Sequence, residues 1–353
     1  MTIINAKTET RSQAGELIAM IQRRGRKLGP LLIMTHDHPD PDGLASAWAL
    51  SHLIKSFHRV RTRIVYGGAL GRGENRLMLE CLEVPAYPFR KSDKDAAVTA
   101  LVDTQPPFKN NRYDPRRHPD ILIDHHPRHP KTGGAFIHID TSIGATTTLL
   151  AEALLEAKVP VPKKLSTAIV YGITSETQNL GREANPRDVA AYLAFLPKAN
   201  MKALWRINNP PRTASFFQML YNGIRDAFVC RRIIGVHLRE VPTPDRVGQM
   251  ADFLLSHETM RWCIVTGRYH GRLHVSLRTH SLTDHAGWLL RSMLGGGNRG
   301  GGHRLVAGGS VKVGLEAPEE KWREAENKVV ATFLKRRGIK NSPQLTYPFR
   351  NSG

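Results

Sequence analysis

The chain has 353 residues, a length that favours two folded domains over one hydrophobic core. Its hydrophobic share of 41% and charged share of 23% are typical of a globular protein and exclude a disordered chain. The 51 basic and 31 acidic residues give a formal net charge of +20, which predicts attraction to polyanions such as nucleic acid, nucleotides, polyphosphate or an anionic membrane surface.

The first part of the chain alternates amphipathic helices with short apolar runs. An amphipathic helix at 12–27 precedes the apolar run Leu-Leu-Ile-Met at 31–34, which predicts a buried strand. Further strands are predicted at 61–66, 96–102, 121–123 and 136–139, and further helices at 44–57, 145–157, 164–174 and 187–196. Strands that alternate with helices indicate an α/β fold with an open, doubly wound, mainly parallel sheet covered on both faces.

Two segments of this part are predicted to be surface loops. Residues 67–76 are rich in glycine but lack the spacing of a dinucleotide fingerprint, and we expect a mobile basic loop with Asn75 and Arg76 as candidate substrate contacts. The Pro- and Arg-rich segment 105–119 is expected to be a surface excursion.

The pattern changes near residue 200 and a smaller α/β unit follows. A helical connector is interrupted at Asn209-Pro210-Pro211, where the chain must leave the helix. Beyond it we predict strands at 228–238, 262–268, 272–278 and 308–313, and helices at 245–256, 284–294 and 318–337. The expected parts are a first domain at 1–198, a connector at 199–226, a second domain at 227–340 and a mobile basic tail at 341–353.

The cysteines and the apolar runs restrict the compartment. Cys81, Cys230 and Cys263 are widely spaced, which excludes a disulfide framework or a structural zinc knuckle and predicts buried free thiols. The first residues lack an apolar core of signal-peptide length, and no run reaches the roughly 18 apolar residues of a membrane span. We expect a soluble, cytoplasmic protein.

Carboxylates and imidazoles follow three predicted strands at the point where each strand ends. These segments are His36-Asp37-His38-Pro39-Asp40-Pro41-Asp42-Gly43, Asp103-Thr104 and Asp124-His125-His126. Ligands of open α/β sheets bind outside the carboxyl ends of strands, and carboxylates gathered there repel one another unless a cation compensates them. This mixture of ligands suits Mn²⁺ or Mg²⁺, with zinc and iron left open, and can hold two ions about 3.5–4 Å apart.

In order and spacing these motifs resemble those of the DHH phosphoesterase family. The resemblance rests on residues 32–50 (LIMTHDHPDPDGLASAWAL), 102–104 and 124–126, continues through 141–155 and 171–177, and extends from about 31 to 313. It implies a first metal held by His36, Asp40 and Asp103. A second metal would be held by Asp42, His125 and the bridging Asp103.

The same resemblance implies roles for three further residues of the first domain. His126 would lie beside the bridging water and the scissile phosphate as an acid or orienting donor, with Asp124 orienting the histidines. Where the family usually has Gly-Ile-x-x-Asp-Thr, this chain has Glu176 at the acidic position. We expect the longer carboxylate to reach the second metal; the alternative is a polar residue at the rim of the site.

A glycine-rich run in the second domain, which we expect to form a turn, carries the remaining expected substrate contacts. Gly-Gly-Gly-His at 300–303 resembles the signature of the DHH-associated C-terminal domain, and backbone N–H groups of such a run can form an anion nest. The resemblance implies contacts to the phosphate or base of a substrate by Arg278, Arg299, Gly300, Gly301, Gly302 and His303.

These expectations combine into a hydrolase whose second domain closes over the metal cleft. Resemblance to the nanoRNase branch implies that it releases nucleoside monophosphates from very short oligoribonucleotides, with 3'-phosphoadenosine-5'-phosphate as a second substrate. The expected partners are short single-stranded RNA or a nucleotide and two divalent cations, Mn²⁺ first, with no membrane; the oligomeric state stays open, a homodimer included. The alternatives are cleavage of inorganic polyphosphate or of a linear or cyclic dinucleotide, a degenerate nucleotide sensor, and a plain nucleic-acid-binding protein.

Overall fold

A computed structural model describes residues 12–281, 283–296, 300–302, 304–339 and 344–350. The chain divides into two compact units between Pro210 and Pro211. Among the described helices, none combines the length and the apolar character needed to cross a bilayer. All three cysteines are free thiols, as expected; Cys230 and Cys263 are buried, whereas Cys81 is only partly buried, contrary to the prediction.

The first unit contains a six-stranded sheet in which every neighbouring pair is parallel. The strand order is β3-β2-β1-β4-β5-β6. The strands are β1 (Leu31–Met34), β2 (Thr62–Tyr66), β3 (Ala86–Pro88), β4 (Val98–Val102), β5 (Ile121–Asp124) and β6 (Phe136–Ile139). The predicted α/β class with a parallel sheet is therefore confirmed.

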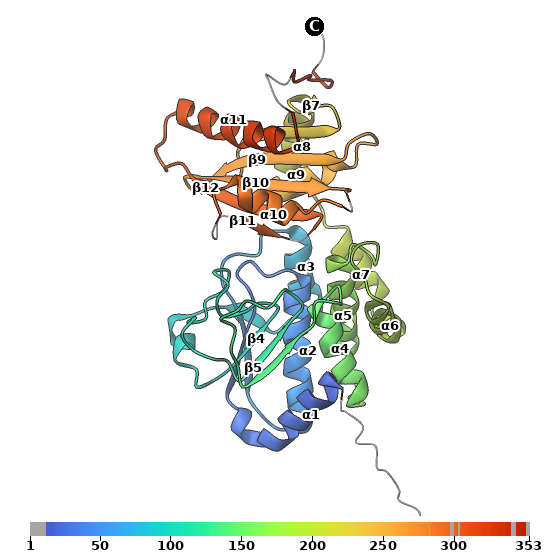
Figure 1. Ribbon diagram of the computed structural model, residues 1–353. Coiled ribbons are helices and arrows are strands. Elements are labelled where there is room, and N and C mark those ends of the chain that lie inside the picture. Colours follow the sequence, from blue (N-terminus) through green and yellow to red (C-terminus); the bar gives the residue numbers. More distant parts are fainter. Residues whose placement is uncertain (1–11, 282, 297–299, 303, 340–343, 351–353) are drawn as a thin grey trace, which may run out of the picture. The chain divides into compact units, whose positions relative to one another are not determined.

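Helices line one face of this sheet, as Figure 1 shows for α2, α4 and α5. The helices of the unit are α1 (Gln13–Arg24), α2 (Pro41–Phe57), α3 (Gly73–Leu82), α4 (Thr146–Glu156), α5 (Lys163–Glu176), α6 (Pro186–Phe195) and α7 (Met201–Asn208). Leu31 and Ile33 of β1 belong to the core shared with these helices. Leu32 and Met34 point the other way, into a smaller cluster with Tyr113. Since successive strand residues face opposite sides, a fully apolar strand is buried on both.

The strand order places a topological switch point between β1 and β4. The chain builds outward from β1 through β2 to β3, and then crosses back to β4 on the other side of β1. At such a point the loops that leave the carboxyl ends of the two central strands diverge and leave room for a ligand. The loops that follow β1 and β4 carry the predicted metal ligands.

Helix α2 begins immediately after the β1 loop because its first residues cap it. The Asp40 side chain accepts a hydrogen bond from the Gly43 N–H (3.0 Å), and Pro41 occupies the first helical turn. Both features stabilise a helix start, so the helix begins earlier than the predicted residue 44.

The prediction of a loop through residue 76 is wrong, because α3 begins at Gly73. Asn75 is buried, and its amide donates to the Pro39 carbonyl (3.0 Å). Its side chain therefore fixes the loop that follows β1. The Arg76 guanidinium donates to the backbone carbonyls of Leu70 and Gly71.

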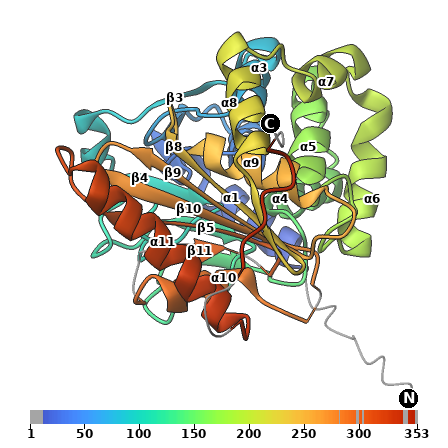
Figure 2. The same cartoon turned by 90° about the horizontal axis from the view of Figure 1, so that it is seen from above.

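The second unit is built on another six-stranded sheet, of order β11-β12-β10-β9-β8-β7. Its strands are β7 (Phe228–Cys230), β8 (Ile233–Glu240), β9 (Trp262–Tyr269), β10 (Arg272–Thr279), β11 (Gly300–Gly302) and β12 (Val306–Lys312). Only the β8–β9 pair among them is parallel. Its helices are α8 (Ala214–Arg225), α9 (Asp245–Leu255), α10 (Ala286–Met293) and α11 (Glu319–Arg336). Helices α10 and α11 pack on one face and α8 and α9 on the other, and Figure 2 shows α11 across strands β8 to β10.

Three predictions for this unit are wrong. The expected strand at 228–238 is a hairpin, because the chain reverses at Arg231, whose φ is +55°. The glycines at 300–302 form an edge strand paired with β12 and not a turn. The tail is not wholly mobile, since Thr346 exchanges backbone hydrogen bonds of 2.8 and 3.0 Å with Val229 of β7.

Candidate metal centre

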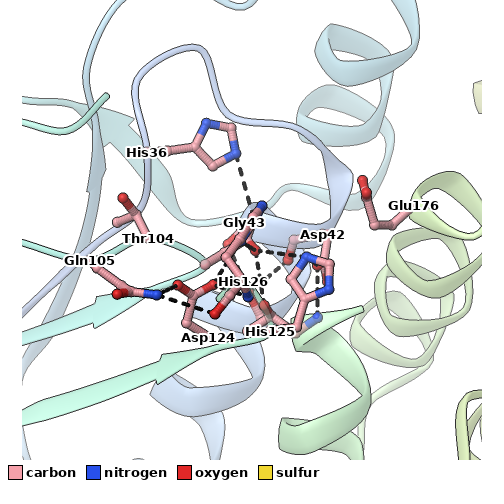
Figure 3. Close-up of polar contacts among 12 residues, drawn as sticks. His36, Asp42, Gly43, Thr104, Gln105, Asp124, His125, His126 and Glu176 are labelled. Atoms are coloured by element: carbon pink, nitrogen blue, oxygen red, sulfur yellow. Dashed lines mark hydrogen bonds and ion pairs between the residues drawn. The ribbon is translucent and has the colours of Figure 1, made fainter. Parts of the chain in front are cut away.

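The loops after β1, β4 and β5 bring five of the six predicted metal ligands together. Figure 3 labels three of them, His36, Asp42 and His125, which come from separate segments of the chain. His36 Nε2 lies 3.5 Å from a carboxylate oxygen of Asp40 and 3.5 Å from one of Asp103. His125 Nε2 lies 3.9 Å from Asp42 Oδ2 and 3.7 Å from Asp103 Oδ1. Asp103 therefore stands between two groups, each with one imidazole and one further carboxylate.

Asp103 is held rigidly in this central position. It is buried, its backbone N–H donates to the Ile123 carbonyl of β5 (2.9 Å), and its Oδ1 accepts a hydrogen bond from the Thr146 hydroxyl (2.9 Å). Its φ of +61° is left-handed, which is uncommon outside glycine but tolerated best by Asp and Asn. Strained residues of this kind gather at functional sites, where the surrounding structure enforces them.

Asp42 is fixed by the amino-terminal end of α4. Its two carboxylate oxygens accept hydrogen bonds from the backbone N–H groups of Thr146 (2.8 Å) and Thr147 (2.7 Å). Free N–H groups at a helix start attract anions, so the helix holds this carboxylate in one orientation. Sequence analysis missed the two threonines, although Gly144-Ala145-Thr146-Thr147 at a predicted helix start was the available signal.

Hydrogen bonds to the backbone orient His36 and His125, two of the three histidines that lie within 4 Å of Asp103. His36 Nδ1 lies 2.9 Å from the Asp37 carbonyl, which only accepts, so this nitrogen carries a proton and the neutral ring offers its lone pair at Nε2. His125 makes a hydrogen bond with the Ile143 backbone. Metal-binding histidines are usually fixed in this way by their second ring nitrogen.

The absence of a side chain at Gly43 leaves room for His36 and Asp103 beside the start of α2. A Cβ at this position would lie 3.3 Å from Asp103 Oδ2 and 3.4 Å from His36 Nε2. Any larger side chain would therefore intrude on the two ligands.

A relay of successive hydrogen bonds holds the His126 ring through its Nδ1 atom. Its Nδ1–H donates to Asp124 Oδ1 (2.8 Å), and the Gln105 amide donates to Asp124 Oδ2 (2.7 Å). Gln105 Oε1 accepts in turn from the His129 N–H (2.8 Å) and the Thr132 hydroxyl (2.7 Å). The prediction of a surface excursion at 105–119 is wrong at its first residue, because Gln105 is fully buried in this relay.

The electrostatics of the site indicate an excess of buried negative charge. Burial, together with the charges of Asp40 and Glu176, raises the pKa of Asp42 to about 8. Burial and the neighbouring Asp42 and Asp40 hold the pKa of Asp103 well above its usual range. Against the effect of burial, the charge of His36 lowers the pKa of Asp40, and Asp40 raises the pKa of His36 to about 9. Such a set of oxygen and imidazole donors fits divalent cations, which would compensate the repulsion.

Glu176 is the one predicted ligand that stands apart. It ends α5, and in Figure 3 no dashed line joins it to the other side chains. Its Oε1 lies 3.6 Å from the guanidinium of Arg182, which also donates to the Glu176 carbonyl (2.9 Å). Burial and the charge of Asp40 raise the pKa of Glu176, so it lies within electrostatic range of the site. Its role as a metal ligand stays a prediction.

The predicted substrate contacts of the second unit are only partly described. Arg278 is buried on β10, where its guanidinium donates to Asp252 (2.5 Å) and to the Ser276 hydroxyl (2.7 Å). Gly300, Gly301 and Gly302 form β11. Arg299 and His303 lie outside the described residues. Substrate binding by this set stays a prediction.

Comparison with known proteins identifies the domain that carries the centre. Residues 30–173 match the model of the DHH family, N-terminal domain. The chain carries a DHH family domain. This domain spans β1 to most of α5 and includes every predicted metal ligand except Glu176.

Relatives and solved structures extend the similarity beyond this domain. An uncharacterized protein of Methanocaldococcus jannaschii is 32% identical over 295 residues, which cover 82% of this chain and 59% of the relative. A probable manganese-dependent inorganic pyrophosphatase of Streptococcus equi is 26% identical over 183 residues, which cover 48% of this chain and 56% of the relative. The chain thus spans less than two thirds of the length of either. An exopolyphosphatase-related protein from Bacteroides fragilis shares the fold with a TM-score of 0.72 and 15% identity, covering 94% of this chain and 99% of that one.

Proposed function

We propose that this chain is a metal-dependent phosphoesterase that uses two divalent cations. The observation that supports it most directly is the position of Asp103, which faces His36 and Asp40 on one side and Asp42 and His125 on the other. His36, Asp40 and Asp103 would hold one cation, and Asp42, Asp103 and His125 the other, with Glu176 as a further candidate. Mn²⁺ is the cation that we expect first, since the Streptococcus equi relative is named as manganese-dependent.

When bound, two such cations lower the pKa of a water and compensate the charge of a phosphoryl group. The chain's own residues would then orient the substrate and supply a proton. Against the effect of burial, Asp124 raises the pKa of His126, which favours the protonated ring. With Nδ1–H committed to Asp124, the Nε2–H of His126 would be the proton donor toward a phosphate oxygen or a leaving group.

For the substrate we propose short oligoribonucleotides, cleaved to nucleoside monophosphates, with 3'-phosphoadenosine-5'-phosphate as a second substrate. The net charge of +20 supports an anionic substrate. The glycine run resembles the signature of the DHH-associated C-terminal domain, which implies contacts to a phosphate or base and so supports a nucleotide. Inorganic polyphosphate or pyrophosphate is the second candidate, because two of the similar proteins are named for hydrolysis of these compounds.

Product analysis on one panel of substrates tests the activity and separates the candidates. The full chain with Mn²⁺ is given di- to pentaribonucleotides, 3'-phosphoadenosine-5'-phosphate, polyphosphate, pyrophosphate and cyclic dinucleotides. We expect monophosphates from the short RNAs, and turnover lower by at least about 10³-fold in Asp103→Ala, because a bridging ligand serves both cations. Orthophosphate released only from polyphosphate or pyrophosphate would favour the second candidate. Binding is measured in parallel for the same panel and for a long nucleic-acid duplex. Nucleotide binding without any turnover would favour a sensor, and tight binding of the duplex alone a nucleic-acid-binding protein.

A further inference from the structure

A cavity lies within the second unit, away from the glycine-rich edge of its sheet. It has a volume of about 520 Å³ and is lined by the sheet at β7 and β8, by α11 and by residues of the segment that follows α11. In the strand order, β7 and β8 stand at the opposite edge from β11. The volume is in the range of small-molecule sites, roughly 300–1,000 Å³.

The lining of this cavity carries more positive than negative charge. Its arginines are Arg225, Arg239, Arg268, Arg323 and Arg350, and its acids are Asp226, Glu319 and Glu326. Arg268 is buried and makes ion pairs with Glu326 (2.7 Å) and Glu319 (2.5 Å), so its charge is compensated within the protein. Arg323 also donates to Glu319 (3.2 Å), so the surplus of positive charge belongs to Arg225, Arg239 and Arg350.

The carboxylate of Asp226 interacts with the charges of three of these arginines. Asp226 accepts hydrogen bonds from Arg225 (2.8 and 3.1 Å) and lies 3.8 Å from Arg350. The hydrogen bonds from Arg225 lower the pKa of Asp226, and the charges of Arg350 and Arg239 add to this effect. Two guanidinium groups beside one carboxylate, with Arg239 also lining the cavity, leave a positive excess, which a phosphate could compensate through charge-assisted hydrogen bonds.

The backbone is irregular where it presents one of these arginines. The pairing of β8 with β9 shifts register between His237 and Glu240, and Arg239 within this bulge has a left-handed φ of +58°. Bulges redirect side chains and are frequent beside binding sites, and a left-handed conformation costs free energy for an arginine. The strand thus departs from regular pairing at a residue that lines the cavity.

The later turns of α11 form an apolar wall with Val330, Ala331 and Leu334, and Phe228 and Tyr347 contribute aromatic rings. The earlier turns of the same helix line the cavity with the polar residues Glu319, Arg323, Glu326 and Asn327. A fitting ligand therefore combines a flat apolar body with an anionic group. Inorganic phosphate would contact only the arginines, and a bare nucleoside only the apolar residues.

We propose that this cavity binds a nucleoside monophosphate or a closely similar aromatic phosphate. The phosphate would face Arg225, Arg239 and Arg350, and the base would lie against Ala331 and its neighbours on α11. The site is separate from the metal centre and does not depend on the proposed hydrolase activity.

Calorimetric titration of the full chain tests this proposal. The protein carries Asp103→Asn and is kept in a chelator, so that cation-dependent binding at the metal centre does not contribute. Adenosine 5'-monophosphate is the probe, with inorganic phosphate and adenosine as its two halves. We expect the monophosphate to bind at least about tenfold more tightly than either half, since both walls contribute.

Two variants, one at the charged wall and one at the apolar wall, and one control locate the binding. Arg239→Ala removes a charge and Ala331→Trp fills the cavity from an exposed helix position, and each should weaken binding at least about tenfold. Arg336→Ala removes an exposed arginine of the same helix that does not line the cavity, and should leave binding unchanged. Circular dichroism checks that each variant is folded. Absence of binding at millimolar concentration, equal binding of phosphate alone, or binding unaffected by both wall variants would overturn the proposal.

Discussion

At the scale of single residues, Asp103 is the most informative position to change. Asn tolerates the left-handed backbone and can still accept from Thr146, so Asp103→Asn removes a negative charge with little change of shape. Because burial and its carboxylate neighbours disfavour the charge, the variant should unfold at a higher temperature than wild type in a chelator. The order should reverse with Mn²⁺, which stabilises only the wild type by binding.

Thermal unfolding with and without Mn²⁺ measures both effects. Asp114→Asn is the matched control, since Asp114 pairs with Arg116 at the surface and should change neither melting temperature by much. An Asp103→Asn protein that is less stable than wild type in the chelator would contradict the account of repulsion among buried carboxylates.

A second prediction concerns the pair of Glu176 and Arg182. The Arg182 side chain is only 9% exposed, and it compensates the partly buried carboxylate of Glu176. Arg182→Ala leaves that carboxylate without its partner, which should lower the metal-free stability by about 1–3 kcal/mol. Mn²⁺ should recover part of this loss, because a cation can compensate Glu176 as well. Arg116→Ala, at an 88% exposed arginine, is the control with little expected effect. A loss that Mn²⁺ leaves unchanged would show that Glu176 does not interact with the cations.

The sequence predicts single residues well where a strand end delivers them. His36, Asp40, Asp103 and His125 follow apolar runs directly, and the parallel sheet brings such ends together. Gln105, Thr146 and Thr147 could not be predicted in this way. Their roles depend on hydrogen bonds to carboxylates that are distant in the chain, and polar residues of these types are common in loops and helix starts.

At the scale of elements, the start of α4 acts as part of the centre. Thr146 is its first residue, and the extended backbone of Ala145 (φ −146°, ψ 139°) is compatible with a following proline. Thr146→Pro would therefore keep the helix but remove the N–H that binds Asp42, while Thr146→Ala removes only the hydroxyl that binds Asp103. We expect each variant to bind Mn²⁺ about 10- to 100-fold less tightly than wild type. The proline variant should have the lower affinity of the two.

Calorimetric titration with Mn²⁺ compares the two variants, and circular dichroism confirms that helix content is retained. Thr148 lies in the same turn but bonds to Asp188, so Thr148→Ser, which keeps the hydroxyl, serves as the control. Equal affinities in the alanine and proline variants would mean that the helix N–H group contributes nothing to holding Asp42.

Another prediction at this scale concerns how stability changes at acid pH. Arg187 of α6 joins Asp140, which follows β6, to Glu152 of α4 through ion pairs of 2.5 and 2.7 Å. Against the effect of burial, hydrogen bonds from Ser142 and Arg187 lower the pKa of Asp140 to about 2. A group with a lowered folded-state pKa contributes stability above its ordinary value near 3.8, and this contribution is lost as the pH falls through about 2. The melting temperature of wild type should exceed that of Arg187→Met by a constant margin above about pH 4, and the margin should shrink toward pH 2. A margin independent of pH over this range would assign the stabilisation to packing.

The sequence predicts most elements because their patterns are local. The failures have local causes too: α3 begins after a glycine-rich stretch typical of loops, and the single apolar run at 228–238 conceals the reversal at Arg231. Edge strands such as β3 and β11 have little apolar alternation, so their pairing is visible only in the sheet.

At the scale of the whole molecule, the chain consists of two units with separate cores, and the residues between α7 and α8 connect them. The composition changes near residue 200, yet α7 packs against α3 and α5 of the first unit and α8 against β8 and α9 of the second. No local pattern distinguishes the two helices in this respect, because each is amphipathic and the choice of partner depends on the completed cores.

The separate cores predict that cations stabilise one unit selectively. All predicted ligands lie between residues 36 and 176, so free energy of Mn²⁺ binding acts on the first unit, by about 2.7 kcal/mol at a hundredfold excess over the dissociation constant. Hydrogen exchange followed by mass spectrometry should show slower exchange in peptides of β1, β4, β5 and α4 on adding Mn²⁺, and unchanged exchange in peptides of β9 and β10. In the Asp103→Asn protein, Mn²⁺ should slow exchange in neither set of peptides. Equal protection of both sheets would mean that the units unfold as one cooperative body, and that the division between Pro210 and Pro211 has no thermodynamic counterpart.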